Sequence, residues 1–239
     1  MIYPKYSSIN QSKLFEINGQ NKLLKLTVKL LSVGKIRLSS SESDFLWLYH
    51  FIVNDEWLDY YVLARGKINS RTGLPQIPKN IKTKPIFFRI DSGCMPSMVF
   101  GDKTCECKEQ LETTIKNLSK KDFGFIVHIP KQDGRGMGID FKLSTLLYQE
   151  EYKTDNVIAS ENISDTKNID RRNYEGVIAI LKYFNLNFAL IDIATNNPLK
   201  ISVFINNGYK VNRSSILVKP TALTKHHLLA KKNKLNHYL

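Results

Sequence analysis

The sequence has no apolar run near the ~20 residues that a helix needs to cross a bilayer. Its first residues, Met-Ile-Tyr-Pro-Lys, also lack the apolar stretch and small-residue cleavage site of a signal peptide. Internal repeats and low-complexity tracts are absent as well. With 42% apolar and 24% charged residues, the 239-residue chain has the profile of a soluble globular protein. We therefore expect a cytoplasmic protein that has no membrane partner.

Acidic residues are scarce, because 22 Asp and Glu stand against 35 Lys and Arg, giving a net charge of +13. Such a surplus is compatible with nucleic-acid binding, with a polyanionic small substrate or with a lysine-rich proteome. The basic residues are scattered, apart from one cluster between residues 225 and 234. No basic helix with interleaved aromatic residues stands out. A scattered surplus is typical of a solvated surface, so we do not expect nucleic acid as the partner.

Cysteine is also rare, with only Cys94, Cys105 and Cys107 in the chain. An odd number without a secretion signal argues against a disulfide framework. Two cysteines one residue apart suggest metal or redox chemistry, although buried thiols that act as small apolar side chains remain an alternative. Three cysteine ligands would leave the fourth position of a tetrahedral zinc ion open to water, which is the arrangement of a catalytic site. Water bound there can ionise near neutral pH and attack an electrophilic carbon.

The pattern of apolar residues predicts an α+β fold, in which a β-rich N-terminal half packs on a mixed helix and strand C-terminal half. Strands are expected at residues 23–31 (where a helix is also possible), 45–53, 59–64, 85–90, 123–129, 188–193 and 209–218, with a turn at 54–56. Helices are expected at residues 108–118, after Gly138 with Leu143, Leu146 and Leu147 as its apolar face, at 174–184, and from Pro198 to about Gly208. We divide the chain into an N-terminal extension (1–43), a catalytic domain (44–219) and a basic tail (220–239) that is helical or loose.

Three further motifs could bind an anion, and each has an ordinary structural alternative. Residues 132–138 read QDGRGMG, which suits a phosphate-binding loop or a plain tight turn. Residues 170–174 read DRRNY before an apolar helix, where adjacent arginines suit an anionic ligand or a surface charge cluster. Residues 195–200 read TNNPLK, which suits anion binding at a helix N-terminus or ordinary capping.

Taken in order, these motifs make the chain resemble the GTP cyclohydrolase II family from about residue 45 to 218. The stretch 94–111, including Gln110, looks like the zinc segment of that family. Residues 132–138 resemble its QEGRGIG loop, and residues 195–200 resemble its TNNPxK element. Residues 170–174 are similar to its DxRDY segment, with Asn173 in place of the second aspartate. The resemblance implies a zinc enzyme of riboflavin synthesis that opens the imidazole ring of GTP.

The resemblance also implies roles for individual residues. Cys94, Cys105 and Cys107 would hold one zinc ion per chain, whose water attacks C8 of guanine. Arg172 matches an arginine proposed as the nucleophile at the α-phosphorus with release of pyrophosphate, although a guanidinium that stays protonated suits charge stabilisation better. Asp170 matches the general base beside it. Residues expected to hold the nucleotide, which is a purine nucleoside triphosphate such as GTP, are Arg89, Gln110, Asp133, Arg135, Asn156, Thr195 and Lys200. The family further implies Mg²⁺ with the nucleotide and a homodimer.

Besides Asn173, four positions depart from the family pattern. Asp91 and Gly93 stand where the family usually has histidine and glutamate, and Asp133 stands for a glutamate. Leu146 occupies the position of a tyrosine near the reacting base, and Tyr148 would face another side of its helix. The expected reaction is opening at C8 with pyrophosphate release, and whether formate is also released is left open. The alternatives are an enzyme that stops at the formamide product, one that acts on another purine nucleotide in a specialised pathway, and an inactive nucleotide-binding protein.

Overall fold

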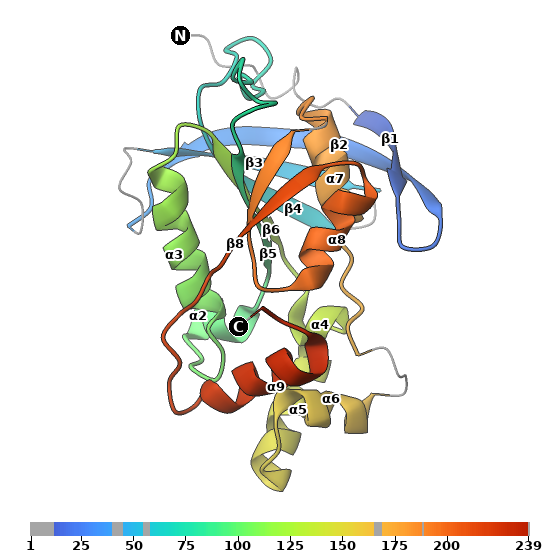
Figure 1. Cartoon of the computed structure of the whole chain (residues 1–239), viewed down its shortest axis with the longest axis vertical. Helices are drawn as coiled ribbons and strands as arrows, with labels where there is room; N and C mark the ends of the chain where they lie inside the picture. Colours follow the sequence, from blue (N-terminus) through green and yellow to red (C-terminus); the bar gives the residue numbers. More distant parts are fainter. Residues whose placement is uncertain (1–11, 40–44, 55–57, 165–168, 188, 239) are drawn as a thin grey trace.

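The computed structural model describes residues 12–39, 45–54, 58–164, 169–187 and 189–238. Its frame is an eight-stranded sheet in the order β1-β2-β3-β4-β6-β5-β7-β8 (Figure 1). The strands are β1 (Ser12–Asn18), β2 (Leu23–Ile36), β3 (Leu46–Val53), β4 (Asp59–Arg65), β5 (Ile86–Ser92), β6 (Gly124–Ile129), β7 (Leu190–Ala194) and β8 (Lys210–Ser214). The α+β class is confirmed, as is the strand alternative for residues 23–31.

The sheet changes character along its width. Strands β1 to β4 form an antiparallel meander, and β4 pairs antiparallel with β6. Strands β6, β5, β7 and β8 then run parallel to one another. Residues 12–36, which the sequence assigns to an N-terminal extension, supply β1 and β2 of this same sheet. The boundaries of the extension, the catalytic domain and the tail stay a prediction. Residues 55–56 of the expected turn and residue 188 of the expected strand lie outside the described residues.

The helices are α2 (Met95–Phe100), α3 (Cys107–Ser119), α4 (Asp133–Gly136), α5 (Ile139–Tyr152), α6 (Asn156–Ile163), α7 (Glu175–Tyr183), α8 (Pro198–Asn206) and α9 (Lys225–Leu235). The helices expected at 108–118, after Gly138, at 174–184 and from Pro198 are confirmed, and the basic tail is helical. Helices α2, α4 and α6 were not predicted. In α5, however, Leu143 is 52% exposed and Leu147 is 69% exposed, so this apolar face does not join the core.

Alternate residues of β5 point to opposite faces of the sheet and enter two apolar clusters. Phe88 packs with the large cluster that contains α7 and Phe204 of α8. Phe87 faces the smaller cluster that contains Leu118 of α3. Helix α7 is almost wholly buried, and Gly176 lets it pack directly against the ring of Tyr60. Both faces of the parallel part of the sheet are therefore covered.

Helices α5, α6 and α9 form a separate group beyond one edge of the sheet (Figure 1). The carboxyl ends of the parallel strands β5, β6 and β7 lie on this side. Cys94 follows β5, residues 132–138 follow β6, and residues 195–200 follow β7. Ligands of sheets with parallel strands bind outside these carboxyl ends. The fold thus brings three of the sequence motifs to one place.

No helix in the described ranges is long and apolar enough to span a bilayer.

Candidate functional site

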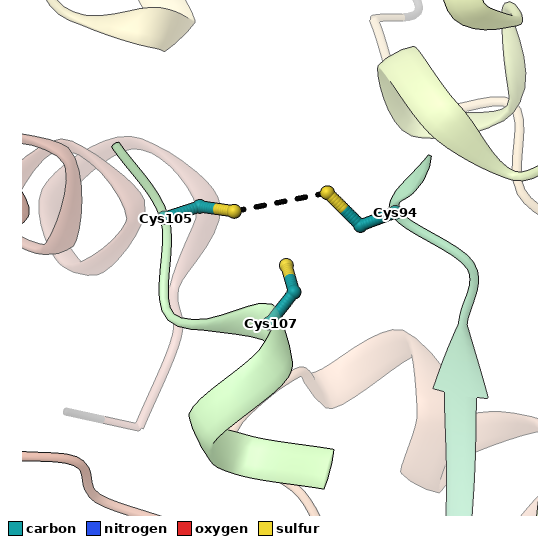
Figure 2. Close-up of side chains that lie close together, drawn as sticks. All are labelled: Cys94, Cys105 and Cys107. Atoms are coloured by element: carbon teal, nitrogen blue, oxygen red, sulfur yellow. Dashed lines mark hydrogen bonds between the residues drawn. The ribbon is translucent and has the colours of Figure 1, made fainter. Parts of the chain in front are cut away.

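Three cysteine sulfurs converge at the carboxyl end of β5 (Figure 2). Cys94 precedes α2, Cys105 lies in the loop after α2, and Cys107 is the first residue of α3. The Sγ atoms of Cys94 and Cys105 are 3.7 Å apart, and all three Sγ atoms lie within 4.8 Å of one another. Tetrahedral zinc with Zn–S bonds of ~2.3 Å separates its sulfur ligands by ~3.8 Å. The cluster can therefore hold one metal ion, and no fourth ligand residue joins it among the residues described.

The chain between Cys94 and Cys105 makes a short helical excursion and returns. Pro96 occupies the first turn of α2, where its missing N–H costs no hydrogen bond. Gly101 ends the helix with a φ of 72°, in the left-handed region that favours glycine. Asp102 then accepts hydrogen bonds from the backbone N–H (3.0 Å) and the hydroxyl (2.8 Å) of Thr104. These contacts turn the chain back and bring Cys105 beside Cys94.

The electrostatics of the cluster favour a cation. Hydrogen bonds from Cys107 and Cys94 lower the pKa of Cys105. Hydrogen bonds with Cys105 and Cys94, together with burial, raise the pKa of Cys107 well above its usual value. Burial acts to lower the pKa of Lys142 on α5, but the three cysteines outweigh it and raise that pKa. Thiolates this close repel one another, so a bound metal ion would stabilise the fully ionised set.

The glycine-rich loop is docked against the arginine motif. Gly134 and Arg135 have φ values of 57° and 58° in α4. A Cβ atom on Gly136 would lie 2.9 Å from the backbone nitrogen of Arg172, so this close approach requires glycine. The backbone N–H of Arg171 donates to the carbonyl of Arg135 at 2.9 Å. The loop is therefore both a tight turn and one wall of the site.

Arg135 points into the cavity with unused hydrogen-bonding capacity. Its Nη2 donates to the carbonyl of Asn156 at 3.4 Å, whereas its buried Nη1 has no partner in the described structure. Burial and the nearby Arg172 lower the pKa of Arg135 to about 10. Asn156 begins α6, which Asp155 caps by accepting the N–H of Val157 at 2.7 Å. Arg135 and Asn156, both expected to hold the nucleotide, are thus in contact.

Asp170 and Arg172 form a two-point ion pair directly before α7, which begins at Glu175. Arg172 Nε donates to Asp170 Oδ1 at 2.8 Å, and Nη2 contacts Oδ2. Burial opposes ionisation, but the hydrogen bonds and charge of Arg172 hold the pKa of Asp170 below its usual value. Burial also opposes the charge on Arg172, yet Tyr174 and Asp170 raise its pKa further. The guanidinium therefore stays protonated, which favours charge stabilisation over nucleophilic attack.

A second group of cations lies where β5 meets α8. Arg89 Nη2 donates to Asp91 Oδ1 at 3.2 Å and to Gln110 Oε1 at 3.4 Å. Lys200 is 7% exposed, and its Nζ donates to the carbonyl of Ile90 at 2.9 Å. Burial and the charges of Arg89 and Arg172 lower the pKa of Lys200 to about 7. Neighbouring cations that lower one another's pKa in this way would be stabilised in their charged forms by an anionic ligand.

Residues 195–200 combine capping with a place in the cavity wall. Thr195 Oγ1 accepts the backbone N–H of Asn197 at 3.1 Å. Asn197 caps α8 by accepting the N–H of Leu199 at 2.9 Å, as the turn alternative suggested. Its buried Nδ2 nonetheless lacks a partner in the described ranges, and Asn197 lines the cavity together with Thr195. Capping and ligand binding are therefore compatible here.

The departures from the family pattern have structural partners of their own. Asp91 is buried, and its Oδ2 lies 2.8 Å from Nδ1 of His128 on the paired strand β6. A Cβ atom on Gly93 would lie 3.0 Å from the carbonyl oxygen of Ile129, so the backbone approaches closely there. Leu146 lines the cavity, whereas the ring of Tyr148 lies 4.3 Å from that of Tyr152. Tyr148 therefore does not replace the family tyrosine.

One cavity collects almost every residue that the sequence singled out. Its lining includes Arg89, Cys94, Cys105, Cys107, Gln110, Asp133, Arg135, Asn156, Arg172, Thr195 and Lys200. Asp133 also accepts the backbone N–H of Met95 at 3.0 Å, which ties the glycine-rich loop to the cysteines. Asp170 is absent from the lining and reaches the cavity through Arg172.

Several lining residues were missed from the sequence. They include Lys142, Thr145, Gln149, Lys231 and His237, whereas Glu106, Gln132, Asn196 and Asn197 lie within the motifs singled out above but were given no role of their own. Lys142, Thr145 and Gln149 share a helical face with Leu146, so the spacing around Leu146 could have revealed them. Nothing in the local sequence marks Lys231 or His237.

Unsatisfied polar atoms also concentrate in this cavity. Seven buried side-chain polar atoms lack a hydrogen-bond partner among the described residues, and six belong to lining residues. The six are Arg89 Nε, Glu106 Oε1, Gln132 Oε1, Arg135 Nη1, Asn156 Oδ1 and Asn197 Nδ2. Buried polar groups are normally paired, so this concentration indicates a binding site for a polar ligand.

Comparison with known proteins matches residues 35–215 to the family described as GTP cyclohydrolase II. A GTP cyclohydrolase-2 of Picrophilus torridus is 29% identical over 205 residues, which cover 85% of this chain and 96% of the relative. A GTP cyclohydrolase-2 of Archaeoglobus fulgidus is 35% identical over 154 residues, which cover 64% of this chain and 39% of the relative. The riboflavin biosynthesis protein RibBA of Staphylococcus saprophyticus is 29% identical over 213 residues, which cover 88% of this chain and 48% of that protein.

Proposed function

The chain belongs to the GTP cyclohydrolase II family, and from this premise we propose that it is a zinc-dependent hydrolase that opens the imidazole ring of GTP at C8 with release of pyrophosphate. The observation that carries the proposal is the convergence of three cysteine sulfurs with a group of buried cations in one cavity. A metal site and an anion site side by side suit a nucleotide whose base and phosphates are handled separately. The proposed pathway is riboflavin synthesis, in line with the names of the relatives.

Cys94, Cys105 and Cys107 would hold one zinc ion, because three thiolate donors within 4.8 Å suit its tetrahedral geometry. When bound, zinc supplies a Lewis acid that lets water ionise near neutral pH. Lys142 would balance part of the thiolate charge. Asp133 would hold the backbone of the cysteine loop through Met95. Mg²⁺ would enter with the triphosphate, whose hard oxygens it prefers.

Arg135, Arg172 and Lys200 would bind the triphosphate. Arg172 is held by both oxygens of Asp170, so its guanidinium is oriented before the ligand arrives. A fixed positive charge at the place where pyrophosphate leaves would stabilise the charge that develops there. We therefore assign Arg172 charge stabilisation, and Asp170 the positioning of Arg172.

The side chain of Leu146 favours a second candidate for the product of the reaction. This apolar side chain lines the cavity where the family places a tyrosine, and Tyr148 lies outside the lining. The nearby Thr145 hydroxyl donates to the carbonyl of Lys142 at 2.7 Å, so it is already engaged. Release of formate is a second hydrolysis with its own need for proton transfer. The loss of one hydroxyl therefore favours an enzyme that stops at the formamide product.

The test is to incubate the pure zinc-loaded protein with GTP and to follow pyrophosphate, formate and product mass together. Pyrophosphate with a ring-opened, formyl-containing product supports ring opening with an early stop. Stoichiometric formate supports the complete reaction and removes the early stop. If GTP is not consumed, other purine nucleoside triphosphates are the next substrates, and failure with all of them would reject the enzyme. The homodimer, also a proposal, is tested by light scattering of the same preparation.

A further inference from the structure

The C-terminal segment, which we define as residues 225–238, follows the part of the chain that matches the family and yet packs against the site. Its helix α9 packs against α6, beyond the carboxyl ends of the parallel strands (Figure 1). Ala230 is buried with Val157 of α6 and with Ile169. Lys234 Nζ lies 3.8 Å from the carboxylate of Glu161 on α6. The segment is therefore attached to the helix that begins at Asn156.

Further contacts attach the end of the C-terminal segment, and the residue just before its start, to two of the site's loops. The backbone N–H of Tyr238 donates to the carbonyl of Asn196 at 3.0 Å, within the motif of residues 195–200. The Arg213 guanidinium lies 4.8 Å from the centre of the Tyr238 ring. Just before α9, the buried Thr224 acts to lower the pKa of Glu106, which lies between Cys105 and Cys107. These contacts hold the segment against the cavity, which it helps to line.

One face of the segment lines the cavity. Leu228, Lys231 and Leu235 are spaced three and four residues apart on α9, and His237 follows the helix. The next residue, Lys232, is exposed and lies outside this lining. Burial and the charges of Lys231, Arg172 and Lys200 lower the pKa of His237 to about 3, so its imidazole is neutral in the ligand-free protein. His237 thus lies among the cations that we assign to the triphosphate.

We propose that the C-terminal segment is a wall of the nucleotide site, in which Lys231 binds the triphosphate and His237 is a hydrogen-bonding group beside it. The identity of the ligand rests on the proposed function. Lys231, Arg172 and Lys200 are cations around one cavity, and a polyanion would relieve their repulsion. A lysine ammonium suits a phosphate oxygen as a mobile point charge. The segment therefore adds specificity for a triphosphate over a monophosphate.

An interaction with Glu106 is the alternative role for the Lys231 side chain. The charge of Lys231 acts to lower the pKa of Glu106, although burial raises that pKa overall, so the two side chains interact. If Lys231 served only to hold Glu106 and the cysteine loop, its loss would disturb every ligand equally. If Lys231 binds the triphosphate, its loss would weaken a triphosphate far more than a monophosphate. Comparison of the two ligands therefore separates the two roles.

The experiment uses the full-length, zinc-loaded protein and measures the Kd of a non-hydrolysable GTP analogue and of GMP. We expect Lys231→Gln to weaken the analogue by roughly tenfold and GMP by less than about twofold, because one charge-assisted hydrogen bond is lost. His237→Ala should also weaken the analogue more than GMP. The matched control Lys232→Gln removes the same charge one residue away and should bind both ligands like the wild type. Zinc content and melting temperature show whether each variant is folded.

Two results would overturn the role of the segment while the proposed function stands. One is a wild type that turns over GTP together with a Lys231→Gln protein that binds the analogue as tightly as Lys232→Gln. The other is an equal loss for the analogue and GMP in Lys231→Gln. A wild type that binds neither ligand and consumes no purine nucleotide would instead reject the proposed function, and the role of the segment with it.

Discussion

Lys200 should take up a proton when a triphosphate binds. Its ammonium is buried beside Arg89 and Arg172, which together with burial lower its pKa to about 7 in the ligand-free protein. A bound polyanion favours the charged form and raises that pKa. At pH 8, one unit above the ligand-free value, about one Lys200 in ten is protonated, so binding should take up about 0.9 proton per site. Binding should be tightest below pH 7 and should weaken as pH rises above it.

Isothermal titration of the non-hydrolysable GTP analogue at pH 8, in buffers that differ in ionisation enthalpy, measures this uptake directly. Lys200→Gln keeps a hydrogen-bond donor but cannot titrate, and should lose the uptake together with the pH dependence of Kd. An uptake near zero in the wild type would refute the reasoning, as would an unchanged uptake in Lys200→Gln. The depressed pKa also affects folding, because the unfolded chain binds the proton between pH 7 and about 10.5. Across that window Lys200 should make the ligand-free protein more stable as pH rises.

Three substitutions test other parts of the account. Arg172→Lys loses the two-point contact with Asp170 and should lower kcat for GTP on the order of 100-fold in a pyrophosphate-release assay. Arg171→Lys, at the exposed neighbouring position, should keep kcat within about twofold of the wild type. Leu146→Tyr should raise the ratio of formate to pyrophosphate, and Leu147→Tyr, 69% exposed on the same helix, should leave it unchanged. Gly136→Ala forces a Cβ to 2.9 Å from the nitrogen of Arg172 and should destabilise the protein by ~1–3 kcal/mol in urea unfolding, with loss of activity.

The regular elements could be predicted where apolar patterning was strong. Residues 45–53 and 59–64 are rich in aromatic and β-branched residues, and they form β3 and β4. The apolar run at 174–184 forms the buried helix α7. Strand β1 was missed because residues 12–18 alternate polar and apolar residues only weakly, and pairing with β2 stabilises it. Helix α2 was missed because six residues between two cysteines show no helical period.

The candidate site could be predicted wherever side chains follow recognisable motifs. The cysteines converge with the motifs at 132–138, 170–174 and 195–200 in one cavity. Cys94 and the motifs at 132–138 and 195–200 each follow one of the parallel strands, whose carboxyl ends lie together. Contacts that depend on register or on distant packing could not be found in this way. The pairing of Asp91 with His128 requires the register of β5 on β6, and His237 reaches the cavity only because α9 packs on α6.

The most direct test of the central claim is the metal content of the purified protein, measured together with GTP consumption. We expect one zinc ion per chain, loss of turnover on chelation, and recovery when zinc is restored. Cys107→Ser should bind far less zinc and should lose turnover, because it removes one of three sulfurs that lie within 4.8 Å of one another. Full GTP turnover by a metal-free protein, or wild-type zinc content in Cys107→Ser, would contradict the assignment of the three cysteines as the ligands of a catalytic zinc.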